Sequence, residues 1–161
     1  MSVIIGLTGP TGAGKSTAAA AAEGFGLQII DCDKLARAAA EKGTDGLKAL
    51  VAAFGEEILL TDGSLDRRAL AAAAFASPQK TELLNETILP HIVKLVLAEA
   101  DGKNVLLDAP TLFESGLDSV CTAVIAVSAN VEIRRERIIK RDGLTADAAD
   151  LRINAGKTDE Y

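Results

Sequence analysis

Aromatic side chains are scarce in this chain. They make up 3% of its 161 residues and tryptophan is absent, although 48% of the residues are hydrophobic. Alanine and leucine supply much of the hydrophobic content instead, and this composition favours helices packed closely on a sheet over an all-β sandwich. A chain of this length is expected to form one domain with a core of its own.

Metal-binding side chains are also few. The sequence holds two cysteines, Cys32 and Cys121, which lie far apart, and a single histidine, His91. This set lacks the ligand spacing of a structural zinc site. Two unclustered thiols are typical of a protein in a reducing compartment.

Positive charge is in deficit, with 17 lysines and arginines against 23 aspartates and glutamates and a formal net charge of −6. A nucleic-acid-binding protein typically shows a basic patch or stripe, so no nucleic-acid partner is expected. The net charge does not exclude a small polyanionic ligand, because a few local cations can dominate the potential in one cleft of an acidic molecule.

Long apolar runs are missing as well. No segment is long enough to span a bilayer. Met1-Ser2 leads straight into an apolar segment and lacks the basic region of a signal peptide. The sequence therefore predicts a cytoplasmic protein with no membrane partner.

Short apolar runs without polar alternation are present, as expected for parallel strands covered on both faces. Alanine-rich helical stretches lie between them, so the predicted class is α/β. The predicted strands are Val3–Thr8, Leu27–Asp31, Asn104–Asp108 and Val120–Val127.

The connection between the second and third strands is unusually long. From Asp31 to Val105 the chain runs more than seventy residues, against roughly thirty for a plain βαβ unit. An insertion at this edge of an open sheet usually builds a substrate site or a lid. The segment Asp62-Gly63-Ser64 reads as a turn, with Ser64 or Asp66 as the next N-cap. The predicted helices are Lys34–Lys42, Asp45–Phe54, Asp66–Phe75 and Pro78–Ala100.

Two further helices are expected after the fourth strand. Asn130 is predicted to cap a helix that ends near Arg141, and Asp142-Gly143 then interrupts the chain. Thr145 is predicted to cap a last helix that ends near Ala155.

The segment from Gly9 to Ser16 fits the pattern G-x-x-x-x-G-K-[ST] and lies between a predicted strand and a predicted helix. In such a loop the backbone N–H groups cradle a phosphate, Lys15 reaches the β- and γ-phosphates, and the Ser16 hydroxyl binds magnesium. The helix that follows adds its positive end to the same anion. The expected ATP contacts are Gly9, Thr11, Gly12, Ala13, Gly14, Lys15, Ser16 and Thr17.

Two carboxylates follow the second strand, in Asp31-Cys32-Asp33. Here they can accept a hydroxyl proton or hold magnesium through water. Asp31 equally suits the cap of the next helix, so both interpretations stay open for it. Asp33 is the candidate general base.

Asp108 ends the third strand, as the magnesium-side carboxylate of phosphate-loop enzymes does. Aspartate at this position is also common in turns. The segment Pro110–Glu114 follows into the same cleft, where Glu114 is either a substrate contact or a solvated loop charge.

Arg134, Arg137 and Arg141 fall on one face of the predicted helix after the fourth strand. Aimed at the cleft, they would neutralise the charge of a transferring phosphoryl group. The alternative is a solvated face paired with Glu132 and Glu136.

Several segments together, in this order, resemble the dephospho-CoA kinase family, and the resemblance is collinear over nearly all of the chain. They are Ile5–Gly9, Ile30–Arg37, Phe54–Leu59, Asp62–Arg67, Pro110–Leu117 and Arg141–Thr145.

The resemblance implies transfer of a phosphoryl group from ATP, with magnesium, to the 3′-hydroxyl of dephospho-CoA, by direct in-line displacement. It implies Asp33 as the base, with Lys15 and Arg141 as catalytic cations, and magnesium on Ser16 and Asp108. Arg137 would contact the nucleotide. The implied substrate contacts are Asp33, Arg37, His91, Pro110, Leu112 and Glu114.

The resemblance also implies a single P-loop kinase domain over residues 1–161 with a three-layer α/β/α fold. Residues 1–33 and 104–129 would form the nucleotide-binding core, 34–103 the helical CoA-binding insertion and 130–155 the lid. A monomer or a weak homo-oligomer is expected.

Three positions depart from the family pattern. Leu89-Pro90 stands where a histidine usually precedes the proline, with His91 two places later, and Gly156 replaces a usual glutamine. The chain stops at Tyr161, where the family typically continues into another strand and a closing helix, which we expect to be missing. The alternatives are another small-molecule or nucleoside-monophosphate kinase, or a truncated, non-catalytic nucleotide-binding protein.

Overall fold

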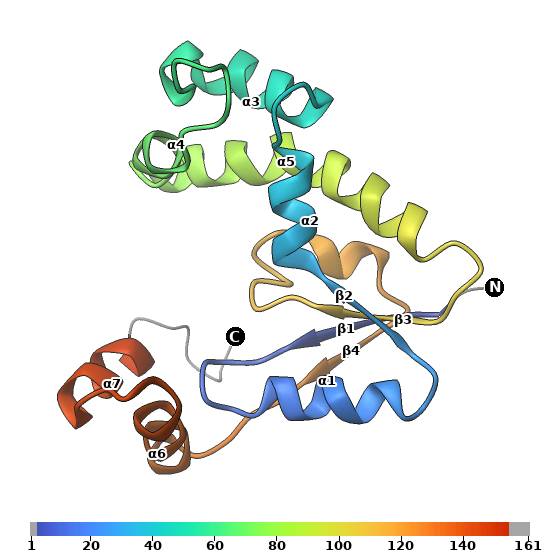
Figure 1. The fold of residues 1–161 in the computed structure, drawn as a ribbon, viewed down its shortest axis with the longest axis vertical. Helices are drawn as coiled ribbons and strands as arrows, with labels where there is room; N and C mark the ends of the chain where they lie inside the picture. The colour runs from blue at the N-terminus through green and yellow to red at the C-terminus, as the bar shows by residue number, and fades with distance from the viewer. Residues whose placement is uncertain (1–2, 155–161) are drawn as a thin grey trace.

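A four-stranded parallel sheet lies in the lower half of the view in Figure 1, between layers of helices. The computed structural model describes residues 3–154, and the strand order is β2-β3-β1-β4. The predicted α/β class with a parallel sheet is therefore confirmed. The strands are β1 (Ile4–Thr8), β2 (Gln28–Asp31), β3 (Val105–Asp108) and β4 (Ala123–Ala126).

Strand β4 differs from its prediction in length and in burial. It begins at Ala123 rather than Val120, because a 3₁₀ helix, η2 (Leu117–Val120), occupies the preceding residues. All four of its residues are exposed, so the expectation that every strand is covered on both faces is wrong for this edge strand.

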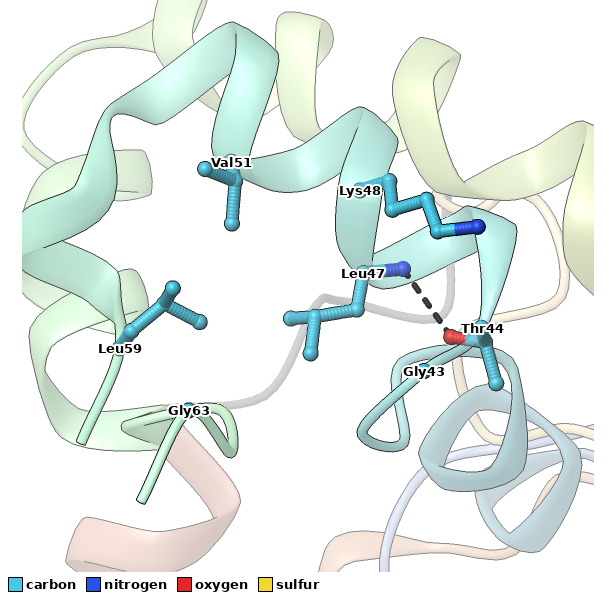
Figure 2. A pocket seen from close by; sticks show the side chains of 7 residues that line it. All are labelled: Gly43, Thr44, Leu47, Lys48, Val51, Leu59 and Gly63. Atoms are coloured by element: carbon cyan, nitrogen blue, oxygen red, sulfur yellow. Dashed lines mark hydrogen bonds between the residues drawn. The ribbon is translucent and has the colours of Figure 1, made fainter. Parts of the chain in front are cut away.

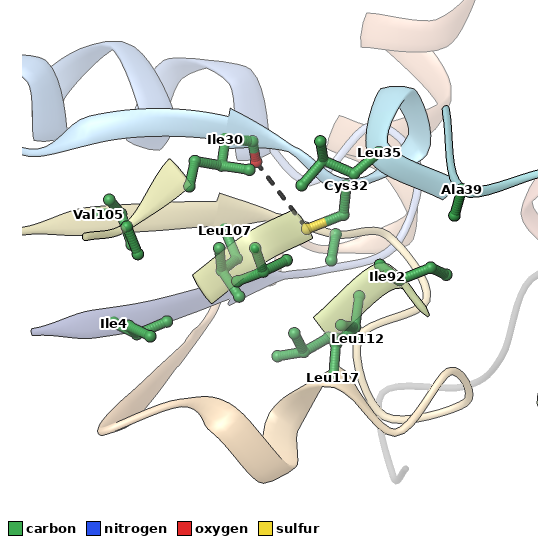
Figure 3. Close-up of a cluster of buried hydrophobic side chains, with 13 residues drawn as sticks. Ile4, Ile30, Cys32, Leu35, Ala39, Ile92, Val105, Leu107, Leu112 and Leu117 are labelled. Carbon is green, nitrogen blue, oxygen red and sulfur yellow. Dashed lines mark hydrogen bonds between the residues drawn. The ribbon is translucent and has the colours of Figure 1, made fainter. Parts of the chain in front are cut away.

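Apolar side chains cover the two faces of the sheet separately. On one face, Ala19 of helix α1 (Lys15–Glu23) packs with Leu7 and Leu106. On the other face, Ile92 and Val96 of helix α5 (Pro78–Glu99) join a larger cluster that includes Ile4, Ile30, Val105 and Leu107 (Figure 3). These two clusters account for the three-layer arrangement.

The insertion predicted between β2 and β3 is helical and stands above the sheet (Figure 1). Its buried residues Ala40, Leu50 and Ile58 form a small core of their own, with Leu70 and Leu84 packed against it. Its elements are α2 (Cys32–Ala39), α3 (Asp45–Phe54), the 3₁₀ helix η1 (Glu56–Ile58), α4 (Arg67–Ala74) and α5.

Side-chain caps fix where the inserted helices begin. Asp66, and not Ser64, caps α4, since its carboxylate accepts the N–H groups of Arg68 and Ala69 at 2.9 and 3.0 Å. Ser64 instead donates to Asp62 within the turn, at 2.6 Å. The α2 helix starts at Cys32, two residues before its predicted start.

Helices α6 (Val131–Asp142) and α7 (Ala146–Asn154) form a hairpin beside the phosphate loop (Figure 1). Ile138, Ala149 and Ile153 form its core. Gly143 ends α6 in the left-handed region, at φ 66°. Thr145 accepts the N–H of Ala148, whereas Asn130 makes no side-chain cap bond. The predicted end at Ala155, and Gly156 after it, lie outside the described residues.

Candidate active site

The phosphate loop turns sharply between β1 and α1. Gly12 and Gly14 have φ values of 80° and 108°, a region that side-chain-bearing residues rarely adopt. A methyl group on Gly12 would also come within 2.8 Å of the carbonyl oxygen of Arg134. Glycine is therefore needed at position 12 both for the turn and for the close approach of α6.

The carbonyl groups of the loop face α6. Arg134 Nε donates to the oxygen of Thr11 at 3.0 Å, and Arg137 donates to the oxygen of Ala13 at 2.9 Å. In a trans peptide the C=O and the next N–H point in opposite directions, so the N–H groups of Gly12 and Gly14 point away from α6. The bonds to α6 therefore leave these two N–H groups available for a phosphate, as a phosphate-binding loop requires.

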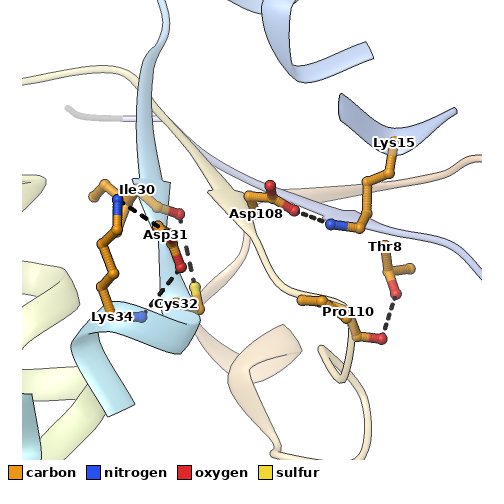
Figure 4. A network of polar contacts seen from close by, with 8 residues as sticks. All are labelled: Thr8, Lys15, Ile30, Asp31, Cys32, Lys34, Asp108 and Pro110. Carbon is orange, nitrogen blue, oxygen red and sulfur yellow. Dashed lines mark hydrogen bonds and ion pairs between the residues drawn. The ribbon is translucent and has the colours of Figure 1, made fainter. Parts of the chain in front are cut away.

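Lys15 and Asp108 meet at the carboxyl end of the sheet (Figure 4). The register pairs Leu7 of β1 with Asp108 of β3, which places this carboxylate beside the loop, and the Lys15 ammonium contacts it directly. Their side chains are 18% and 27% exposed, so the ion pair is partly shielded from water. Two predicted site residues are thus brought together.

The residues present suit a magnesium ion shared with a bound nucleotide. Ser16 is exposed in the first turn of α1, and Asp108 supplies a carboxylate. Among the described residues, no group of three or more acidic, cysteine or histidine side chains could hold a metal ion. Magnesium is commonly bound by one or two carboxylates together with phosphate oxygens and water, and this arrangement fits that pattern.

Burial, followed by the negative charge of Asp108, raises the pKa of the Cys32 thiol to about 12, and the charges of Cys121, Asp33 and Asp31 act in the same direction. The register also pairs Asp31 with Asp108 on neighbouring strands. The predicted base, Asp33, therefore follows β2 at the same edge of the sheet as the Lys15–Asp108 pair.

Asp31 and Asp33 differ in what they bind. The Asp31 carboxylate caps α2, accepting the N–H of Lys34 at 3.1 Å and pairing with its ammonium at 3.4 Å (Figure 4). Burial raises the pKa of Asp31, but the bonds and charge of Lys34 outweigh this and hold it below its usual value. Asp33 is exposed in the first turn of α2, so the candidate base is accessible.

A groove of about 700 Å³ runs between the first half of α5 and the segment that follows β3. Asn85 joins its two walls by donating to the carbonyl oxygen of Glu114 at 2.7 Å. Phe75 and Phe113 also line it and are 68% and 40% exposed. Glu114 was predicted as a site residue, whereas Asn85 and Phe75 were missed.

The sequence did contain a pattern for the groove wall formed by α5, which was not predicted. Thr81, Asn85 and Leu89 line the groove at a spacing of four residues, which places them on one face of a helix. The spacing alone does not identify which face of a helix meets a groove.

Leu112 does not join the site. It has no exposed surface and packs in the core, where a methyl group on Gly6 would lie 2.6 Å from its Cδ2 atom. No surface of Leu112 is accessible to a substrate, so the prediction of Leu112 as a substrate contact is wrong.

The other predicted substrate contacts lie outside the groove lining. Pro110 is exposed and accepts a long bond from the Thr8 hydroxyl, at 3.4 Å. Arg37 is exposed in the last turn of α2, and His91 is half-buried further along α5. Their roles stay predictions.

The predicted arginine row divides between two environments. Arg134 is 3% exposed, so the interpretation as a solvated face is wrong for it. Arg134 and Arg137 hold the phosphate loop, as described above. Arg141 instead donates two bonds to its neighbour Asp142, at 2.6 and 2.8 Å.

A second pocket, of about 340 Å³, lies in the insertion and contains none of the predicted site residues (Figure 2). Thr44, at its edge, caps α3 by accepting the N–H of Leu47 at 3.1 Å. The other lining residues are Gly43, Lys48, Val51, Leu59 and Gly63.

Within residues 3–154, no helix has the length and apolar character needed to cross a membrane.

The family model and the relatives found by sequence give the same family. A family model described as dephospho-CoA kinase matches residues 3–161. A dephospho-CoA kinase of Geobacillus kaustophilus is 40% identical over 161 residues, covering 96% of this chain and 80% of its own length. One from Corynebacterium glutamicum is 43% identical, covering 97% and 83%. A crystal structure from Thermus thermophilus has a TM-score of 0.75 at 33% identity, covering 99% of this chain and 82% of that chain.

Proposed function

The chain belongs to the dephospho-CoA kinase family, and from this we propose that it transfers a phosphoryl group from ATP to the 3′-hydroxyl of dephospho-CoA. The observation that carries the proposal is the strand register, which pairs Asp31 of β2 with Asp108 of β3, the partner of Lys15. It supports an exposed carboxylate, Asp33 in the first turn of α2, at the same edge of the sheet as the lysine of the phosphate loop, as transfer to a hydroxyl group requires.

On the donor side, we propose that the loop N–H groups and Lys15 bind the phosphates of ATP. Lys15 contacts Asp108, which supports a position for its ammonium at the carboxyl end of the sheet, beside the phosphate loop. Ser16 and Asp108 would hold magnesium, Asp108 through water. Bound there, the ion would neutralise charge on the β- and γ-phosphates.

On the acceptor side, we propose that Asp33 orients the 3′-hydroxyl and takes its proton. The oxygen then forms a bond to the γ-phosphorus as the bond from that phosphorus to the bridging oxygen of ADP breaks. The products are coenzyme A and ADP, and the proton ends on the Asp33 carboxylate. Because positioning and electrostatics supply most of such catalysis, no covalent phosphoenzyme is needed.

We propose that the groove between α5 and the Pro110–Leu117 segment binds an uncharged part of dephospho-CoA. The described residues that line it include Glu82, Glu86 and Glu114 and no lysine, arginine or histidine. Such a lining repels a pyrophosphate, whereas it suits amide, hydroxyl and aromatic groups. Residues 34–103 would then be the acceptor-binding part of the domain, with Arg37 and His91 as further contacts.

Residues 130–155 are proposed as the lid, with Arg137 and Arg141 acting on the nucleotide. Arg141 is 57% exposed and bonded to Asp142, so it would exchange this partner for a phosphate when the lid closes. A monomeric or weakly associated, cytoplasmic enzyme stays a prediction.

Two matched substitutions test the assignment of the base. Asp33→Asn removes the proposed proton acceptor, and we expect kcat to fall by about a hundredfold or more with little change in ATP affinity. Asp31→Asn is the control, because asparagine caps a helix as well as aspartate does, so its turnover should stay close to that of the unsubstituted protein.

The reverse pattern, with turnover lost in Asp31→Asn and kept in Asp33→Asn, would move the role of base to Asp31. Normal turnover in both variants would exclude Asp31 and Asp33 as the base.

A further inference from the structure

Two arginines of helix α6 donate hydrogen bonds to the backbone carbonyl groups of the phosphate loop. Arg134 Nε donates to the Thr11 carbonyl at 3.0 Å. One Arg137 nitrogen donates to the carbonyls of Gly12 and Ala13 at 3.2 and 2.9 Å. Three consecutive loop carbonyls are therefore bonded to one turn of a helix more than a hundred residues away in sequence.

The Arg134 side chain is buried in this contact between α6 and the phosphate loop. It is 3% exposed, which is unusual for a charged side chain unless it is paired or hydrogen-bonded. Its backbone abuts the loop as well, since a methyl group on Gly12 would lie 2.8 Å from its carbonyl oxygen and 3.1 Å from its Cα atom. The glycine turn and the helix fit directly against each other.

We propose that Arg134 is a positioning residue for ATP binding, which acts through the phosphate loop rather than on the substrate. By holding the Thr11 carbonyl toward α6, it fixes the Gly12 N–H toward the phosphates, because the two groups point in opposite directions in a trans peptide. Its bond to the carbonyl also polarises that peptide, which makes the N–H a stronger donor.

Arginine suits this role better than lysine. The guanidinium group is planar and its donors have fixed directions, whereas the lysine ammonium is a point charge on a flexible chain. A lysine at position 134 would keep the positive charge and lose the fixed direction of Nε. The two properties can therefore be separated by substitution.

The same helix offers a matched control. Arg135 Nε donates to Asp150 of α7 at 2.5 Å and is 37% exposed. Within residues 3–154, the Arg135 side chain forms no hydrogen bond or ion pair with the phosphate loop. Replacing it removes an arginine from α6, and a link between α6 and α7, without touching the loop.

The test compares Arg134→Met, Arg134→Lys and Arg135→Met. Dissociation constants for magnesium–ATP are measured by calorimetry without acceptor, and kcat and KM for each substrate are measured separately. We expect Arg134→Met to weaken ATP binding by about tenfold or more, as for loss of a charge-assisted hydrogen bond. Arg134→Lys should fall between Arg134→Met and the unsubstituted protein. Arg135→Met should bind ATP normally, and the KM for the acceptor should not change.

Thermal melts of each variant separate this role from a structural one. The inference is overturned if folded Arg134→Met binds ATP within about twofold of the unsubstituted protein, or if Arg135→Met weakens binding equally. If Arg134→Met does not fold, Arg134→Lys decides, and unchanged affinity there overturns the inference. The inference rests on the proposed function only in that the loop binds ATP. Binding measured without acceptor therefore stays informative even if dephospho-CoA is not phosphorylated.

Discussion

At the scale of single residues, position within an element decides what a carboxylate can do. Asp31 and Asp33 are two residues apart, yet Asp31 is committed to the N-cap of α2, whereas Asp33 is exposed in its first turn. The sequence predicted a carboxylate pair at this edge and left the role of Asp31 open. The pKa of Asp31 is lowered by its bonds to Lys34 against the effect of burial, which supports its role as a cap.

Cys32 provides a prediction at the same scale. Because its pKa is raised to about 12, first by burial and then by Asp108, its reactive thiolate is scarce at neutral pH. We expect Cys32 in the folded protein to react with iodoacetamide at pH 8 far more slowly than in urea. Mass spectrometry of the digested protein measures this, and equal rates in the two states would contradict the prediction.

The sign of the linked stability change follows from the same shift. Between the unfolded thiol pKa, near 9, and the folded value of about 12, the unfolded chain has released its proton and the native protein retains it. The free energy of unfolding therefore falls as pH rises through this window. Replacing Cys32 with alanine should remove that part of the slope.

At the scale of elements, the sequence predicted which helices and strands are present better than it predicted where each one ends and what it packs against. Every helix expected between β2 and β3 is present, and α3 has the predicted bounds. The starts of α2 and α4 depended on which polar side chain accepts the first N–H groups. The sequence offered Ser64 and Asp66 equally, and only the folded turn, in which Ser64 bonds to Asp62, separates them.

The cap of α4 gives a matched pair of substitutions. Asp66→Ala removes the acceptor of two backbone N–H groups, and the free energy of unfolding should fall by about 1 kcal/mol. Ser64→Ala removes a hydroxyl that bonds only within the exposed turn, so a smaller loss is expected. Urea denaturation of both variants measures the difference, and a larger loss for Ser64→Ala would contradict the assignment.

At the scale of the whole molecule, contacts between distant segments were the least predictable part. The motif from Gly9 to Ser16 predicted a phosphate loop, and the arginine spacing predicted one helix face. Neither pattern indicated that Arg134 and Arg137 hold that loop by its carbonyl groups. Such a contact depends on how α6 leaves the exposed edge strand β4, and no local pattern encodes that.

The same limit applies to the acceptor groove. One wall follows β3 in sequence and the other belongs to the inserted helix α5, with Asn85 joining them at the Glu114 carbonyl. The sequence predicted Glu114, as a substrate contact or a solvated charge, from its place after the third strand. It missed Asn85, because helix spacing marks one face of a helix without showing what that face contacts. The groove and the phosphate loop together define the central claim, that one chain binds both ATP and a large, partly uncharged acceptor.

The most direct test of this claim is the formation of ADP by the purified chain with magnesium–ATP, with and without dephospho-CoA. The account predicts that ADP forms only with this acceptor, in step with a product heavier by one phosphoryl group at the 3′-hydroxyl. Nucleoside monophosphates should not replace dephospho-CoA. ADP formed equally well without dephospho-CoA, or dephospho-CoA recovered unchanged while a nucleoside monophosphate is phosphorylated, would contradict it.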